Sequence, residues 1–158
     1  MSRPPFALAL AVALPLGCAH AKIANTSIDD TPENRAVLEV VESYRQAFQS
    51  RDAGALLALV SPRYYEDNGN TDRADDYDRE GLKAELAREF DQTKALQLDV
   101  KINDIAVEED QARAFAYVEY TIRAHNKFPS GERWQTDSDR ARITLEREGD
   151  KWLIVSGI

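Results

Sequence analysis

The chain has 158 residues, of which 43% are hydrophobic and 30% charged, and this length and composition indicate a globular protein with a single folded domain. Its formal net charge of −8 argues against a nucleic-acid partner, because phosphate binding needs a basic face. With one cysteine and two histidines, the chain lacks a disulfide framework and has too few soft ligands for a His-rich metal site. We therefore expect no metal and no cofactor.

Residues 1–17 have the pattern of a signal peptide. A positively charged start, Met1 to Arg3, precedes an apolar run from Phe6 to Leu14. This run is shorter than the roughly 18 apolar residues that span a bilayer, and it has the length of a signal-peptide core. The sequence therefore predicts export to the cell envelope or periplasm.

Two ways of processing this leader remain open. Residues 14–18 (LPLGC) resemble a bacterial lipobox, with the small residue Gly17 directly before Cys18, although the two residues before Gly17 depart from the usual pattern. Lipidation of Cys18 would hold the protein on a membrane through this anchor alone. Ordinary cleavage after Ala21 would instead release a soluble secreted protein. In either case, residues 18–31 show no periodicity and are expected to form a tether.

The domain, residues 32–158, is predicted to begin with three helices. Thr31-Pro32-Glu33 is a helix start, followed by a hydrophobic stripe of Val37, Val40, Val41, Tyr44 and Phe48. Asp52 is expected to cap a short second helix, and Asp78 a third. Between them, a short strand is expected near Tyr64 and a polar surface loop over residues 66–78.

From Ala95 onward the hydrophobic period changes from 3.6 to 2, which predicts four long strands near residues 96–107, 112–124, 134–146 and 152–158. The alternation changes phase near Asn103-Asp104, which predicts a β-bulge. The connections are short turns, so neighbouring strands should pair antiparallel. Helices followed by a run of strands indicate an α+β domain.

The order of elements and several segments resemble the NTF2-like (SnoaL-like) superfamily. Residues 44–48 (YRQAF), Asp52 and residues 56–59 (LLAL) are similar to its first two helices, and residues 151–157 (KWLIVSG) to its last strand. The resemblance implies a cone in which three N-terminal helices pack in a curved antiparallel sheet of about four long strands plus one short one, around an internal pocket. Members include isomerases, cyclases, dehydratases and non-catalytic binding modules, so the fold does not select a function.

Resemblance to the ketosteroid isomerases of this fold implies a catalytic role for Tyr44. Tyr44 matches their oxyanion-donating tyrosine, whereas Asp67 lies one residue short of the position of their base, where Asn68 stands. Glu119 and Asp137 are candidates for the second donor. The alternative is that Tyr44 belongs to the apolar stripe and that Asp67 is a solvated loop residue.

A second pair of carboxylates lies on one predicted strand. Asp137 and Asp139 share the parity of Ala141, so both would point into the cone near its mouth. One of two close carboxylates can retain its proton at neutral pH, which suits acid–base chemistry. The alternative is an exposed strand end on which both are paired with arginine.

The outer face of the predicted sheet offers an interface. Phe115 and Tyr117 alternate with charged side chains there, a pattern that suits a protein contact and predicts a homodimer.

Taken together, these features favour an exported module that binds a small apolar ligand or a protein partner without catalysis. The alternative is a small pocket enzyme of the isomerase, dehydratase or cyclase type that uses Tyr44 with Asp67 or with the Asp137/Asp139 pair.

Replacing Cys18 with serine tests the anchor. We expect Cys18→Ser to move the protein from the membrane fraction to the soluble fraction, because the thiol that would carry the acyl chains is gone. Cell fractionation followed by immunoblotting measures the shift, and Ala19→Ser is the matched control. An unchanged distribution, with a mature chain that starts at Lys22 by mass spectrometry, would favour cleavage after Ala21.

Overall fold

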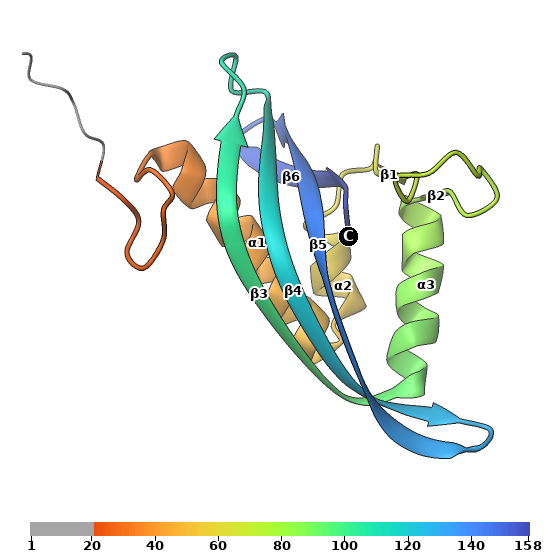
Figure 1. Ribbon diagram of the computed structural model, residues 1–158. Helices are drawn as coiled ribbons and strands as arrows, with labels where there is room; N and C mark the ends of the chain where they lie inside the picture. Colours follow the sequence, from red (N-terminus) through yellow and green to blue (C-terminus); the bar gives the residue numbers. More distant parts are fainter. Residues whose placement is uncertain (1–20) are drawn as a thin grey trace, which may run out of the picture.

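The computed structural model describes residues 21–158 and confirms an α+β domain in which the helices precede the sheet. Strands β3 to β6 form one antiparallel sheet in sequence order, and β1 and β2 pair separately. The sheet curves around α1. Helix α3 lies on the same side of the sheet, next to the part of the sheet that extends beyond α1 (Figure 1). The elements are α1 (Pro32–Ser50), α2 (Ala53–Leu57), β1 (Tyr65–Glu66), β2 (Tyr77–Asp78), α3 (Arg79–Gln92), β3 (Thr93–Val107), β4 (Arg113–Phe128), β5 (Gly131–Glu148) and β6 (Lys151–Ser156).

All three predicted helix caps are present. The Thr31 hydroxyl accepts a hydrogen bond from the Asn34 backbone N–H at 3.1 Å. The Asp52 carboxylate accepts one from the Ala55 N–H at 2.9 Å, and the Asp78 carboxylate accepts two at the start of α3. Each cap satisfies donors that the first helical turn leaves unpaired, so local sequence determines where these helices begin.

The predicted bulge is confirmed in β3. The register with β4 shifts between Ile102 and Asp104, so that Leu98 and Ile105, seven residues apart, are both buried in the same core. The predicted turns are also confirmed, and the β4–β5 pairing continues as far as Phe128 and Gly131.

The expectation for residues 66–78 was wrong at both ends of the loop. Glu66 pairs with Tyr77 and Tyr65 with Asp78, so the loop is closed by a two-residue ladder. Tyr64, expected within the strand, precedes it and is only 2% exposed. The Tyr64 and Tyr77 rings lie 6.2 Å apart. Packing of these rings against the core holds the ends of the loop together, and polarity alone did not reveal this.

Residues 22–30 fold back onto the domain, in contrast to the expected tether. Lys22 forms a bridge with Asp29, and Ile28 is 2% exposed within the hydrophobic core. The buried Asn34 amide donates a hydrogen bond to the Asp29 carbonyl at 2.9 Å. One apolar side chain and one amide therefore attach this segment to the start of α1. Cys18, the predicted lipidation site, lies outside the described residues.

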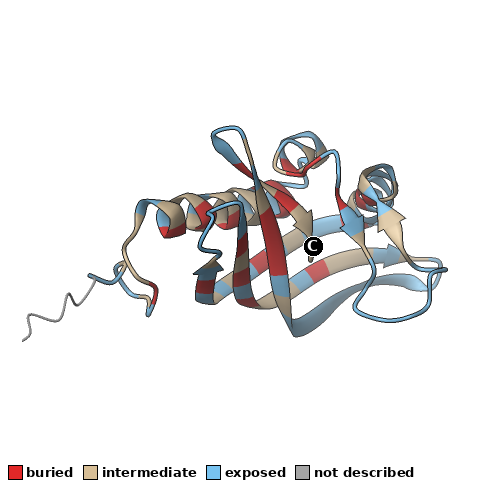
Figure 2. Ribbon diagram, turned by 90° about the horizontal axis from the view of Figure 1, so that it is seen from above, coloured by how far each residue is buried: buried red, intermediate tan, exposed pale blue. Residues whose placement is uncertain are grey.

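The long strands extend beyond the helix that covers them. The 19 residues of α1 span about 28 Å, whereas the 16 residues of β4 span about 53 Å. Buried residues gather where α1 lies on the sheet, and residues 131–140 of β5 are exposed throughout (Figure 2). The inner face of the sheet beyond α1 is therefore left to face α3.

We expect Ile28→Ala to destabilise the domain by about 2–4 kcal/mol, because it leaves a cavity in the core. Thermal or urea denaturation of the purified protein measures this loss. Ala24→Ser, on an exposed residue of the same segment, is the control and should leave stability unchanged. Equal stability of Ile28→Ala and the wild type would show that residues 22–30 behave as a free tether.

Candidate functional site

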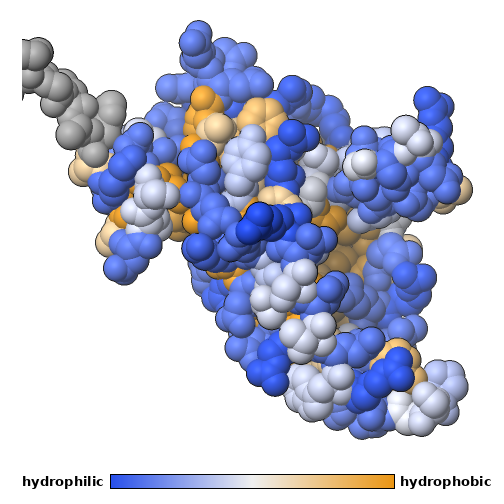
Figure 3. Space-filling model, in the orientation of Figure 1, coloured by the Kyte–Doolittle hydropathy of each residue, from blue (hydrophilic) through white to orange (hydrophobic). Residues whose placement is uncertain are grey.

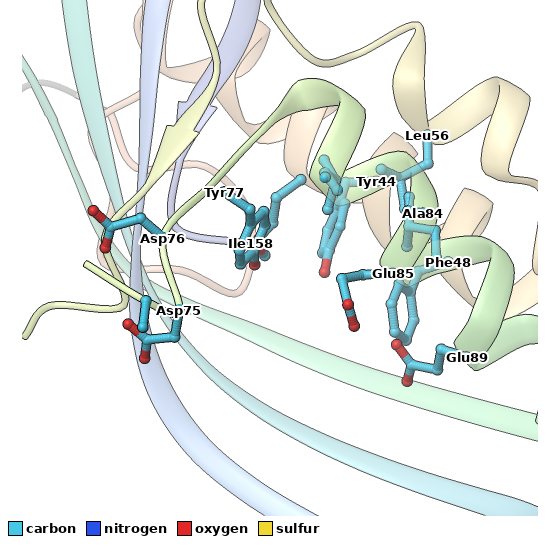
Figure 4. Close-up of a pocket in the computed structure, with 14 residues that line it drawn as sticks. Tyr44, Phe48, Leu56, Asp75, Asp76, Tyr77, Ala84, Glu85, Glu89 and Ile158 are labelled. Carbon is cyan, nitrogen blue, oxygen red and sulfur yellow. The ribbon is translucent and has the colours of Figure 1, made fainter. Parts of the chain in front are cut away.

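A hollow lies between the helices and the inner face of the sheet. It has two lobes with volumes of about 550 and 800 Å³. Both lobes are lined by Tyr44, Phe48, Tyr77, Glu89 and Ile158, so they form one continuous site. Figure 4 shows these side chains around the smaller lobe, and Figure 3 shows hydrophobic residues in the hollow beside α3, framed by hydrophilic surface.

The sheet supplies an apolar wall to the larger lobe. Leu98 and Val100 come from β3, Ile122 from β4, and Ala141 and Ile143 from β5. They share the inner face because side chains alternate along each strand and the strands pair antiparallel. The predicted alternation, in which every second side chain of a strand faces the inside of the cone, is thereby confirmed for this part of the sheet.

Tyr44 projects from α1 into both lobes. Burial raises the pKa of its phenol well above the ordinary value, and the nearby Glu89 carboxylate raises it further. The hydroxyl is therefore protonated at neutral pH. It makes no hydrogen bond to another described residue, so its O–H group is available to a ligand.

Glu89 is the functional candidate that the sequence analysis missed. It lies on α3, where Leu82 and Leu86 are buried, and it lines both lobes together with Glu85 in the smaller one. Limited hydration within the hollow raises the pKa of Glu89, and the neighbouring Glu85 raises it further. The signal in the sequence was an acid directly before the apolar position Phe90, at the border of the helix's hydrophobic stripe.

Two more tyrosines line the hollow from segments far apart in the sequence. Burial raises the pKa of Tyr77, whose hydroxyl donates a hydrogen bond to the Ile158 carbonyl at 3.2 Å. Burial also raises the pKa of Tyr120 on β4, and Asp139 and Asp137 raise it further. Tyr120 was not among the candidate site residues named from the sequence.

The carboxylates proposed from sequence lie toward the mouth. Asp67 and Asp139 line the larger lobe, whereas Asp137 is not part of its lining. All three are exposed. Each carboxylate also accepts a hydrogen bond from a nearby backbone N–H: Gly69 for Asp67, Ser138 for Asp137 and Arg140 for Asp139. Tyr44 and Asp139 thus border one hollow, and their catalytic roles stay predictions.

Residues 21–158 contain no group of three or more His, Cys, Asp and Glu side chains arranged to hold a metal ion. Within the same range, no helix is long and apolar enough to cross a membrane.

The outer sheet face carries the aromatic residues expected for an interface. Tyr117 is 41% exposed, and Phe115 is partly covered by the Arg142 guanidinium, 5.5 Å from its ring. Further along this face, Trp134 is 57% exposed and stacks on His125 with ring centroids 5.1 Å apart. The homodimer stays a prediction.

Comparison of the chain with known proteins identifies its fold but not its activity. No protein-family model matches the chain, and no curated protein matches it. Solved structures do match. A candidate scytalone dehydratase from Novosphingobium aromaticivorans has a TM-score of 0.66 at 11% identity, over 79% of this chain and 80% of that chain.

Two further structures are similar. A candidate dehydratase of the NTF2-like family from Streptomyces avermitilis has a TM-score of 0.63 at 14% identity, over 79% of this chain and 93% of that chain. A candidate polyketide cyclase from Xanthomonas campestris has a TM-score of 0.53 at 16% identity, over 79% and 89% of the two chains. The chain therefore has the NTF2-like cone fold, as its sequence predicted.

Replacing Glu89 with glutamine should stabilise the domain at neutral pH. The pKa of Glu89 is raised in the folded state, so at pH values above that pKa the ionised carboxylate lowers the free energy of unfolding. As the pH falls through the raised pKa, the folded protein takes up the proton first and this penalty disappears. We expect a higher melting temperature for Glu89→Gln at neutral pH, with a difference that closes in acid.

Differential scanning calorimetry over a pH series measures this difference. Glu39→Gln, an exposed position on α1 outside the hollow, is the control and should show no such trend. If Glu89→Gln melts at or below the wild-type temperature at neutral pH, the Glu89 carboxylate has a stabilising partner.

Proposed function

We propose that this NTF2-like domain binds a small, largely apolar molecule in the hollow and does not transform it chemically. The observation that carries the proposal is the hollow itself, with an apolar wall from three strands and polar groups at a few positions. Ligand pockets usually combine a mostly apolar lining with few convergent polar groups, in volumes of about 300–1,000 Å³.

The surroundings of the acids support binding rather than catalysis. A base must reach the proton that it removes in a site that excludes water. Asp67, Asp137 and Asp139 are exposed, and each holds a backbone N–H. Tyr44 and Glu89 line both lobes of the hollow, and they suit orientation of a ligand.

A second candidate function is dehydration, favoured by Tyr44 and Asp139 on opposite walls of one lobe and by the candidate dehydratases of the same fold. In such a reaction the Asp139 carboxylate would remove the proton next to a substrate carbonyl. A carbon–carbon double bond would form as the β carbon–oxygen bond breaks, and the departing hydroxide would take the proton from Asp139 and leave as water, which regenerates the carboxylate. The Tyr44 hydroxyl would stabilise the charge that develops on the carbonyl oxygen.

Filling the hollow tests the binding function. Val100→Trp should weaken binding of the neutral fluorescent probe N-phenyl-1-naphthylamine by at least about tenfold, because the larger side chain occupies the apolar wall. Asp99→Trp is the matched control, since Asp99 is exposed on the opposite face of the same strand, and it should bind as the wild type does. Equal binding by wild type and Val100→Trp would place the probe elsewhere and contradict the proposal.

A turnover assay separates the two candidate functions. We expect the protein to leave a panel of β-hydroxy ketones unchanged. The measurement is the ultraviolet absorbance of the conjugated product that dehydration would form. Turnover that is lost in both Tyr44→Phe and Asp139→Asn, while both variants keep the wild-type melting temperature, would replace binding with dehydration.

A further inference from the structure

We propose that two copies of this chain pair through the exposed edge of β5, antiparallel to each other and in a register centred on Thr136. The contact would join the two four-stranded sheets into one continuous sheet. It uses a different surface from the outer-face homodimer predicted from the sequence, and the binding function proposed above does not depend on it.

Strand β5 has a long edge that no other described strand covers. It pairs with β4 along its whole length, whereas β6 pairs with it only over residues 144–148. The backbone at Gly157 lies against the Arg142 carbonyl and covers the next part of the edge. Residues 131–140 are exposed throughout, and with the end of β4 they form an arm that extends past α3 (Figure 1). This arm leaves one side of β5 open to a further strand.

The backbone groups of even-numbered residues point outward at this edge. The Arg147 N–H donates a hydrogen bond to the Ala112 carbonyl beside β4 at 2.9 Å, and the register between β4 and β5 is unbroken. Because backbone groups alternate along a strand, odd-numbered residues of β5 face β4 and even-numbered residues face away from it. The groups presented at the open edge therefore belong to Glu132, Trp134, Thr136, Ser138 and Arg140.

Two of these outward N–H groups are held by side chains of their own strand. The Ser138 N–H donates to the Asp137 carboxylate at 3.0 Å, and the Arg140 N–H donates to the Asp139 carboxylate at 2.8 Å. A strand edge with unpaired backbone groups is a template for pairing with another strand. A second copy would replace these exposed local bonds with a ladder, and it would release both carboxylates to face its own side chains.

The charges along the edge are self-complementary. An antiparallel copy must oppose even-numbered residues to even-numbered ones, because only these present backbone groups at the edge. With Thr136 opposite itself, Glu132 lies opposite Arg140, and Arg133 lies opposite Asp139. Each face of the joined sheet therefore pairs unlike charges, twice over by symmetry, and opposite charges directly across a strand pair stabilise it.

Neighbouring registers lose this match. A register centred on Asp137 places that carboxylate opposite itself, and the next one along places it opposite Asp139. In the other direction, a register centred on Gln135 retains only Arg133 opposite Asp137. Like charges directly opposite each other destabilise a strand pair, so the register centred on Thr136 is favoured.

Arg133 and Asp139 gain the most from the pairing. Within residues 21–158 neither side chain forms an ion pair, and the Arg133 guanidinium lies over the Phe128 ring at 4.2 Å. Glu132 and Arg140, in contrast, already have partners in their own chain. Opposed odd-numbered residues would form the close type of pair, with Cα atoms about 4.5 Å apart. Since Asp139 lines the larger lobe, the second copy would contribute an arginine to the mouth of the hollow.

A symmetric cysteine tests the register. In the protein carrying Cys18→Ser, which removes the single native thiol, Thr136→Cys should form a disulfide-linked dimer under mild oxidation, because this residue meets its own copy at a Cα separation of about 5.5 Å. Ser138→Cys, exposed on the same face, is the control. Its two copies would lie about 14 Å apart, too far for a disulfide. Non-reducing gel electrophoresis measures the linked fraction.

Charge reversal tests the pairing without a covalent bond. We expect the Cys18→Ser protein to form a dimer in sedimentation velocity over a concentration series. Arg133→Asp should raise the dissociation constant at least about tenfold, because two carboxylates then oppose each other. Arg133→Asp combined with Asp139→Arg should return it to within about threefold of the starting value, because the unlike pair is restored. Arg123→Asp, exposed on β4 one strand away from the edge, is the control.

Linking through Thr136→Cys alone, together with loss and rescue of the dimer by the charge variants, would support the edge pairing. A monomer at every concentration, or equal linking through Thr136→Cys and Ser138→Cys, would overturn it. A dimer that Tyr117→Asp dissociates and Arg133→Asp leaves intact would also overturn it, and would assign the contact to the outer face of the sheet.

Discussion

The difference in length between the helices and the strands governs the rest of this structure. At about 1.5 Å per helical residue and about 3.3 Å per strand residue, α1 cannot cover strands of 16 and 18 residues. Curvature of the sheet brings its uncovered inner face opposite α3 instead of leaving it flat in solvent (Figure 1). The core forms where α1 lies on the sheet, and the hollow forms where α1 ends.

Because the hollow lies where the layers separate, its chemistry comes from side chains on different layers. Tyr44 comes from α1, Glu89 from α3 and Tyr120 from β4, and their pKa values all rise because the hollow limits hydration. The tyrosines remain neutral donors, whereas Glu89 is a carboxylate without a partner. This combination of an apolar wall with a few hydroxyl and carboxylate groups suits a ligand that is mostly apolar.

The similar solved structures share this frame but carry different candidate activities, including dehydration and cyclisation, at identities of 11–16%. At such identities the common property is the backbone arrangement, and the side chains in the hollow decide what each protein does. For this chain, the acids at the mouth accept hydrogen bonds from backbone N–H groups, while the side chain of Glu89 on α3 makes no hydrogen bond to another described residue. A function transferred from the fold alone would overlook that difference.

Local sequence determined the helix starts at Thr31, Asp52 and Asp78, the bulge in β3 and the inward face of each strand, because caps and alternation act over a few residues. It also placed Tyr44 and Asp139 at the hollow. Only the tertiary structure decided that Ile28 enters the core, that Tyr77 closes a ladder with Glu66, and that Glu89 lines the same hollow as Tyr44 and Tyr120. Those contacts join segments distant in the sequence, and they depend on how far the sheet bends and where α3 stands against it, which no short stretch of residues encodes.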